Sequence, residues 1–232
     1  MGIEETNEQP QTPSYEKDYA FRIYKIFNNS PLKHLGIKEL SDFIIPPNEL
    51  YTRKISFQKW LQEKNNQNIK LKIFSLLTKR IKEIEITLNN INNNNEEVLG
   101  CSLNFENYKT AERKLLHVLK VKENSFAQES LYLIENQDYL IGIKSLNDGK
   151  YYSINNDKLE ELIVGFIDIL NRNKGKECEF YIYNIRRGPK IIMAKIPDDR
   201  NFSLGCDVAF GRIHEFPMKI NESDDEKKSL KE

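Results

Sequence analysis

The sharpest candidate for chemistry is the short run Arg186-Arg187-Gly188-Pro189-Lys190. Three cations close together on one turn can bind phosphate, and a glycine among them lets the backbone approach an anion closely. A turn that carries arginines is also typical of winged or ribbon-type DNA binders, which contact the phosphate backbone or the minor groove. The alternative interpretation is an ordinary solvated turn.

A second group of polar side chains lies near the C-terminal end. It consists of Asp198, Asp199, Arg200, Asp207, Arg212, His214 and Glu215, and a hydrolase would use Asp198, Asp199, Asp207 and His214. These residue types hold a divalent metal or move protons in metal-dependent hydrolases and nucleases. The acid-x-Lys that such a nuclease motif needs on the next strand is missing, and Pro197-Asp198-Asp199 also fits a simple turn.

Metal ligands and cofactor motifs are scarce in the rest of the sequence. The three histidines and three cysteines are widely spaced, so no metal site and no disulfide framework are predicted. The ten glycines are scattered singly, so no phosphate-cradling loop and no nucleotide cofactor are indicated. The sequence therefore predicts no catalytic residue and no cofactor, and it favours a protein that is not an enzyme.

Positive charge is concentrated in one stretch, although the whole chain of 232 residues has a formal net charge of zero. Between Arg53 and Lys82 there are nine Lys or Arg residues and one acid, Glu63. Between Val121 and Ile185 there are seven basic and eleven acidic residues. The positive stretch can meet an anion such as nucleic acid, and a solvated helix surface is the alternative.

The chain from Lys17 to Lys64 resembles a helix-turn-helix unit. The spacing of its apolar residues predicts helices over 17–27, 37–43 and 47–64, and Pro46-Pro47 separates the last two. The resemblance implies that the 47–64 helix enters the major groove. The predicted nucleic-acid-binding residues are Thr52, Arg53, Lys54, Ser56, Lys59 and Lys64 from this region and Arg186, Arg187 and Lys190 from the basic turn. A small helical bundle without DNA binding is the alternative.

A long helix is predicted over 69–91, before the asparagine-rich run 89–95. Its apolar residues follow alternating steps of three and four, the heptad pattern of a coiled coil. These are Phe74, Leu77, Ile81, Ile84, Leu88 and Ile91. A coiled coil of three heptads is only marginally stable alone, so another helix must cover this apolar row. That helix would come from a second copy of the chain in a homodimer, from a protein partner, or from the chain itself.

A further helix is predicted over 105–121, and after it the apolar period shifts toward two. Short strands are predicted around turns at 135–138 and 147–150, followed by a helix over 158–173 and a hairpin that turns at 186–189. The predicted fold class is α+β, with a helical N-terminal part before an antiparallel β-β-β-α-β-β domain that has one helix on the sheet. The predicted domains are a disordered leader (1–15), a helical part (16–95), the α+β domain (96–220) and a disordered charged tail (221–232).

The sequence also predicts a cytoplasmic location without membrane contact. No apolar run approaches the roughly 18 residues that span a bilayer, and the N-terminus lacks the apolar core of a signal peptide. Residues 1–6 match the loose myristoylation pattern, but glutamates follow the glycine and no polybasic second signal is present. An odd number of dispersed cysteines fits a reducing compartment.

Together these features predict a dimeric nucleic-acid-binding or regulatory protein. Its basic helical region would bind, and its α+β domain would sense a ligand or form the oligomer. The first alternative is a non-catalytic assembly or adaptor protein that binds other polypeptides through the predicted long helix and the strand edges. The second alternative is a metal-dependent hydrolase or nuclease.

Overall fold

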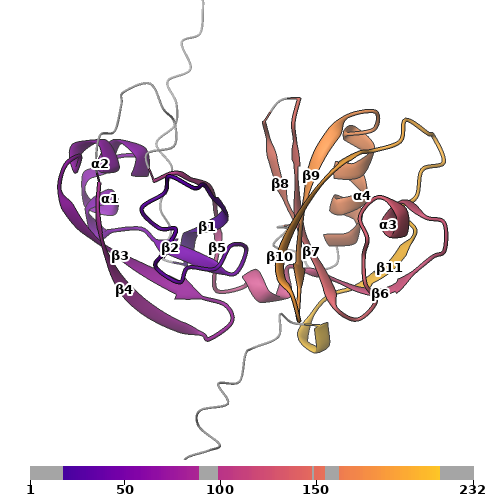
Figure 1. Cartoon of the computed structure of the whole chain (residues 1–232), viewed down its shortest axis with the longest axis horizontal. Helices are drawn as coiled ribbons and strands as arrows, with labels where there is room; N and C mark the ends of the chain where they lie inside the picture. The colour runs from indigo at the N-terminus through magenta and orange to yellow at the C-terminus, as the bar shows by residue number, and fades with distance from the viewer. Residues whose placement is uncertain (1–17, 89–98, 148, 155–161, 215–232) are drawn as a thin grey trace, which may run out of the picture.

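The computed structural model describes residues 18–88, 99–147, 149–154 and 162–214. In these residues the chain is mostly β and forms two antiparallel sheets that lie side by side (Figure 1). The predicted α+β class with a helical N-terminal part is therefore wrong. None of the helices in the described residues is long and apolar enough to span a bilayer.

The first unit is a five-stranded sheet with two short helices. Its strands are β1 (Tyr19–Ile26), β2 (Asp42–Ile45), β3 (Asn68–Ser75), β4 (Arg80–Thr87) and β5 (Cys101–Asn107), and its helices are α1 (Asn48–Arg53) and α2 (Phe57–Glu63). The strands lie in the spatial order β4-β3-β2-β1-β5. Trp60 and Leu61 of α2 are buried against Ile44, Leu71 and Ile73 of the sheet, so the helices cover one sheet face.

The second unit is a six-stranded sheet. Its strands are β6 (Leu116–Val121), β7 (Asp138–Ser145), β8 (Tyr151–Ser153), β9 (Glu177–Asn184), β10 (Gly188–Lys195) and β11 (Cys206–Ala209), and its helices are α3 (Phe126–Glu129) and α4 (Leu162–Arg172). The short 3-10 turns η1 (Ala111–Arg113) and η3 (Arg212–His214) precede β6 and follow β11. The order is β10-β9-β7-β6-β11, with β8 paired to β7. Phe166 and Leu170 of α4 are buried on this sheet against Phe180 and Ile182.

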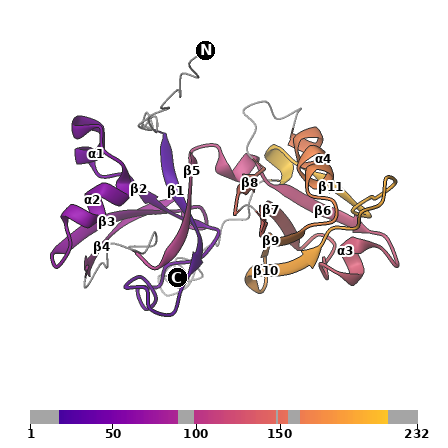
Figure 2. The same cartoon turned by 90° about the horizontal axis from the view of Figure 1, so that it is seen from above.

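A third apolar cluster lies between the two sheets. It joins Tyr24 and Phe43 of the first unit to Tyr181 and Tyr183 of the second. The rings of Tyr24 and Tyr181 meet edge to face, with centroids 4.8 Å apart and planes at 89°, a favourable geometry for aromatic pairs. Each sheet is thus covered by helices on its outer face and by the other sheet on its inner face, as Figure 2 shows from above.

The two units repeat one arrangement. Position by position, the strand order β4-β3-β2-β1-β5 corresponds to β10-β9-β7-β6-β11. The helices also correspond, because α1 and α2 lie between β2 and β3, and α4 lies between β7 and β9. The sequence Leu-Gly-Cys opens the last strand of each unit, at residues 99–101 and 204–206. The fold is therefore an internal duplication.

The predicted long helix over 69–91 is absent, because residues 68–87 form the β3–β4 hairpin. Apolar and charged residues alternate in Ile69-Lys70-Leu71-Lys72-Ile73, the period of a half-buried strand. Phe74 and Ile81, seven residues apart in the supposed heptad, are cross-strand partners. The predicted coiled coil is therefore wrong in its secondary structure.

The predicted helix-turn-helix is absent as well. Residues 17–27 contain β1, where Ile23 and Tyr24 are both buried because the sheet is covered on both faces. The supposed reading helix over 47–64 is divided into α1 and α2, since Lys54 has a left-handed backbone with a φ of 50°. That conformation ends α1, and Ser56 caps α2 by accepting a hydrogen bond from the Lys59 amide.

The helix predicted over 105–121 is absent, because these residues contain the end of β5, η1 and β6. Other elements of the second half lie where the sequence pattern placed them. The predicted helix over 158–173 contains α4, and the hairpin with the basic turn is β9–β10. The proposed domain border near residue 95 lies outside the described residues, and β5, which follows it, pairs with β1 of the first sheet. The predicted leader and tail also lie outside the described residues.

Candidate functional site

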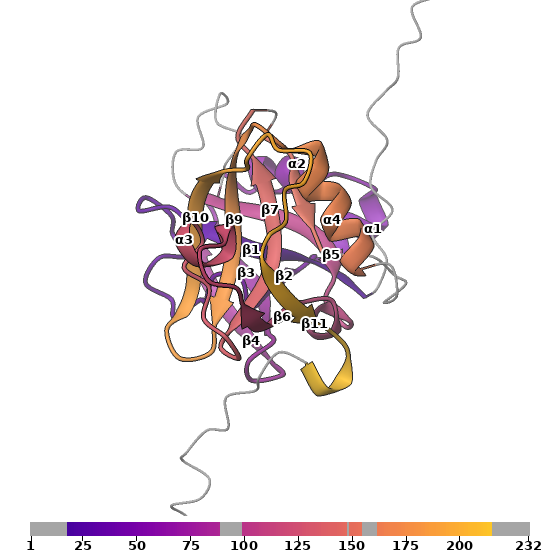
Figure 3. The ribbon, with the colours of Figure 1, turned by 90° about the vertical axis from the view of Figure 1, so that its right-hand side faces the viewer.

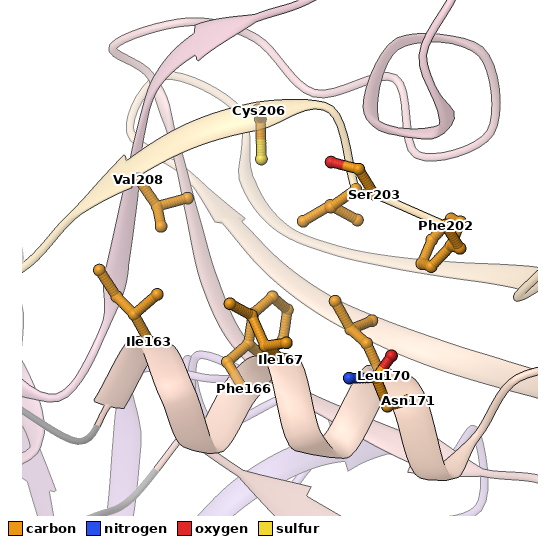
Figure 4. Close-up of a pocket in the computed structure, with 10 residues that line it drawn as sticks. Ile163, Phe166, Ile167, Leu170, Asn171, Phe202, Ser203, Cys206 and Val208 are labelled. Carbon is orange, nitrogen blue, oxygen red and sulfur yellow. The ribbon is translucent and has the colours of Figure 1, made fainter. Parts of the chain in front are cut away.

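An apolar groove lies between α4 and β11 on the outer side of the second unit. The side chains that line it are Ile163, Phe166, Ile167, Leu170 and Asn171 from α4 and Phe202, Ser203, Leu204, Cys206 and Val208 from β11 and the loop before it. The cavity volume is about 210 Å³. Figure 4 shows the two rows of side chains facing one another across the groove, and Figure 3 faces the unit that contains it.

The sequence builds both walls of the groove. On α4 the lining residues Ile163, Phe166, Ile167 and Leu170 follow the spacing of one helix face. Among the strands that the structure describes, the opposite wall, β11, pairs only with β6 and is the last strand of the sheet. An edge strand leaves one row of backbone N–H and C=O groups unpaired, so an extended peptide can add to it as a further strand. The groove can therefore take apolar side chains while the strand edge binds the peptide backbone.

A glycine turn holds the start of β11 in place. Gly205 has a φ of +80°, and a Cβ on it would lie 2.2 Å from the Cβ of Ser125. Its carbonyl accepts a 2.8 Å hydrogen bond from the Lys122 amide. The first unit repeats this turn, because the Gly100 carbonyl accepts a 2.9 Å bond from Phe27 and a Cβ on Gly100 would lie 2.9 Å from the Cα of Ser30.

Cys206 is the most polarisable group in the groove, but it is not an activated nucleophile. Burial, followed by the nearby Asp207 carboxylate, raises the pKa of its thiol to about 12. The thiol is therefore protonated at neutral pH, and a thiolate is what a nucleophilic cysteine requires. In this place Cys206 acts as a small apolar side chain.

The basic residues predicted from the first unit are largely compensated by acids. Arg53 makes a two-pronged contact with Glu63, with nitrogen–oxygen distances of 2.6 and 3.0 Å. Lys64 lies 3.4 Å from a carboxylate oxygen of Glu49. Thr52, Arg53, Lys54, Ser56 and Lys59 are exposed on or beside α1 and α2.

The positive stretch continues into acids directly after its end. Glu83 and Glu85 stand opposite Lys72 and Lys70 on the β3–β4 hairpin. Lys70 is 3.3 Å from a carboxylate oxygen of Glu83. The charge of this surface is therefore mixed. The count of basic residues from Arg53 to Lys82 does not show this, because Glu83 and Glu85 follow directly after it.

The other predicted residues lie in separate places. Arg186 and Arg187 lie in the β9–β10 turn of the second unit and Lys190 lies in β10, so they do not join the group around α1 and α2. Among the residues predicted for oligomerisation, Ile91 lies outside the described residues and the other five lie in or beside β3 and β4. Leu77 and Leu88 are buried, and Ile81 is 56% exposed. Their contact with a partner stays a prediction.

The acidic group near the C-terminal end does not form a metal centre. In the described part of the chain, no three His, Cys, Asp or Glu side chains are grouped to hold a metal ion. Asp199 accepts a 2.9 Å hydrogen bond from the Asn201 amide, as expected for a turn. His214 instead meets His117, with 3.1 Å between their Nδ1 atoms. No sequence motif indicates this pair, because 97 residues separate its members.

The groove residues were also missed from the sequence, although a signal was present. The Leu-Gly-Cys triplet occurs once in each unit, at the start of its edge strand, and so indicates the duplication. The helical period over 163–170 indicates one apolar face but does not show that this face lines a groove, where Ile167 is 49% exposed.

Comparison with known proteins agrees with a duplicated unit. The model of the GRASP55/65 PDZ-like domain family matches residues 9–91 and again 71–219. Human Golgi reassembly-stacking protein 1 is 24% identical over 224 residues, which cover 94% of this chain and 47% of the human protein. An uncharacterized protein of Schizosaccharomyces pombe is 23% identical over 214 residues, covering 89% of this chain and 56% of that protein. The chain thus spans about half the length of these curated relatives.

These matches overturn the predicted function. A PDZ-like domain and a Golgi stacking relative do not fit a helix-turn-helix regulator of nucleic acid, so that prediction is wrong, and they favour the alternative of a non-catalytic assembly protein. The match to a Golgi stacking protein likewise contradicts a cytoplasmic protein without membrane contact. Because the family model covers most of the chain in two overlapping matches, the chain belongs to the GRASP55/65 PDZ-like domain family.

Proposed function

We propose that this chain is a non-catalytic tethering module of Golgi membranes that acts by holding polypeptide segments of its partners. The observation that carries the proposal is the open apolar groove beside the edge strand β11. Support for the membrane setting comes from the human relative, whose name describes reassembly and stacking of the Golgi.

The groove fits an extended peptide whose alternate side chains are apolar. In a strand, every second side chain points to the same side, so such a peptide places its apolar groups against α4 while its backbone pairs with β11. The two walls supply matching positions, with Ile163 opposite Val208 and Leu170 near Phe202 (Figure 4). Backbone pairing provides affinity for any sequence, and the apolar pockets select among sequences.

The test is a binding measurement with fluorescent short peptides of alternating apolar residues, with free or amidated C-termini. Ile167→Lys places a charge in the groove, whereas Val164→Lys places the same charge on α4 at a position that is 60% exposed and outside the groove. We expect the first change to abolish peptide binding and the second to preserve it. Equal binding by both variants, or none by the wild-type chain to any peptide of the panel, would contradict the groove as the site.

The Golgi setting is tested separately in cells. A fluorescent fusion of the chain should overlap with a Golgi marker. A uniform distribution through the cell would contradict the membrane part of the proposal and leave the peptide measurement as it is.

A further inference from the structure

The turn between β9 and β10 presents two uncompensated cations. Arg186 and Arg187 are exposed, and among the described residues neither guanidinium makes an ion pair. Ile185, next to them, is 37% exposed. This contrasts with Arg53 of the first unit, which is paired with Glu63.

A buried side chain fixes the turn in this shape. The Oδ1 atom of Asn184 accepts hydrogen bonds from the amides of Arg186 and Arg187, at 3.0 and 2.9 Å. The Nδ2 group of Asn184 donates a 2.6 Å bond to Oδ1 of Asp138, and both side chains are buried. The backbone of the turn is thereby ordered before any ligand arrives, which lowers the entropy lost on binding.

The same buried carboxylate also holds an exposed aromatic residue nearby. Lys190 lies 3.6 Å from Oδ2 of Asp138 and donates a 2.7 Å hydrogen bond to the carbonyl of Tyr132. Tyr132 has a φ of +49° and is 67% exposed. A left-handed backbone is rare for a bulky residue and persists where the surrounding structure enforces it, commonly at functional sites.

We propose that this turn, with Arg186, Arg187 and Tyr132, is a docking surface for the anionic phospholipid headgroups of a membrane. Guanidinium groups bind phosphate oxygens through paired hydrogen bonds, and tyrosine favours the boundary between headgroups and acyl chains. The Asp138 carboxylate is buried and bound by Asn184 and Lys190, so it does not face a ligand at the surface of the turn. The charge left at the surface of the turn is positive.

This contact goes beyond peptide capture and does not depend on it. The turn belongs to the sheet edge formed by β10, and the groove lies at the opposite edge, formed by β11. A chain bound to lipid through the turn therefore keeps the groove open. Loss of peptide binding in Ile167→Lys should leave lipid binding unchanged, so the two proposals fail independently.

The test is flotation of the full-length, unacylated chain with vesicles of phosphatidylcholine alone or with about 30 mol% phosphatidylserine. Each cation close to an anionic surface contributes roughly a fivefold gain in partitioning, so Arg186→Ala/Arg187→Ala should lose about 30-fold. The matched control is Arg80→Ala/Arg200→Ala, which removes two exposed arginines elsewhere and the same net charge. The control should bind as the wild type does. Tyr132→Ala should weaken binding to the anionic vesicles independently of salt.

Three results would overturn the proposal. Equal losses in the turn variant and the control variant would make binding a matter of net charge only. Equal binding to neutral and anionic vesicles would remove the headgroup charge from the interaction. Complete competition by millimolar glycerophosphoserine or inorganic phosphate would assign the turn to soluble phosphate instead of a membrane surface. Unchanged thermal unfolding of each variant confirms that a loss is not caused by unfolding.

Discussion

The contact between Gly205 and Ser125 yields a prediction that separates backbone strain from side-chain collision. In Gly205→Ala the new Cβ would lie 2.2 Å from the Ser125 Cβ, and the backbone would keep a φ of +80°. The left-handed conformation costs an alanine about 1–2 kcal/mol, and forcing a methyl group into a filled site costs about 1–3 kcal/mol more. The expected loss in the free energy of unfolding is therefore about 3 kcal/mol.

A second glycine isolates the two contributions. Gly211 lies shortly after β11 with a φ of +93°, and nothing lies within 4 Å of a Cβ built on it. Gly211→Ala should therefore show only the strain, about 1–2 kcal/mol. The excess loss in Gly205→Ala measures the collision with Ser125.

The rescue experiment is the double variant Gly205→Ala/Ser125→Gly. Ser125 caps α3 by accepting a hydrogen bond from Gln128, and glycine at a cap costs only a few tenths of a kcal/mol relative to serine. Urea unfolding curves of the two single variants and the double variant should give a coupling energy of about 1–3 kcal/mol. If Gly205→Ala is no less stable than Gly211→Ala, or if Ser125→Gly restores nothing, the account of this turn is refuted.

Two further changes probe the pair of histidines and the contact between the sheets. Burial lowers the pKa of His117 in the folded chain. In the unfolded chain the pKa of histidine is about 6.5, so below that pH the unfolded chain binds more protons than the folded chain. The midpoint of urea unfolding should therefore fall as the pH falls below about 6.5. His117→Phe should flatten this dependence, and an unchanged pH profile would contradict the assignment. Tyr24→Ala removes a ring that contacts Tyr151 and Tyr181, so it should destabilise the chain by about 3–5 kcal/mol. Trp60, the one tryptophan of the chain, is buried in the first unit, so its fluorescence should then report a transition separate from that seen by circular dichroism; coincident transitions would show that the units still unfold together.

Parts of the second half of the fold were accessible from the sequence because their signals are local, although the helix expected over 105–121 is β strand at both ends. The apolar face of 162–170 has one period, that of a helix, and the Arg186-to-Pro189 turn separates two strand-like runs. The prediction for the first half was wrong because the spacing of its apolar residues fits both a helical and a strand period. Phe74, Leu77 and Ile81 fit a heptad, while 69–73 alternate as a strand. Helices cover one face of the first sheet and the second sheet covers the other, so neighbouring residues such as Ile23 and Tyr24 are both buried, whereas a half-exposed strand would leave one of them outside.

The candidate site was harder to predict, because its walls come from distant parts of the second unit. Nothing local in 163–170 tells a groove wall from a core face, since both need the same apolar spacing. Similarly, whether β11 is an edge or an interior strand depends on the order of the whole sheet. Only the repeated Leu-Gly-Cys triplet could have linked the two edges in advance.

The stacking of the two sheets face to face has a consequence for valency. Their shared inner faces leave the helices α1 and α2 of the first unit and α4 of the second on opposite outer sides of one body (Figure 1). If each helix-covered side takes a peptide at its edge strand, β5 or β11, the chain is a rigid divalent connector whose two sites face away from each other. A single partner with a short linker between its binding segments could not reach both, whereas segments on two separate surfaces could each occupy one. The geometry thus favours cross-linking over chelation, and the strength of an array would grow with the number of connectors through avidity.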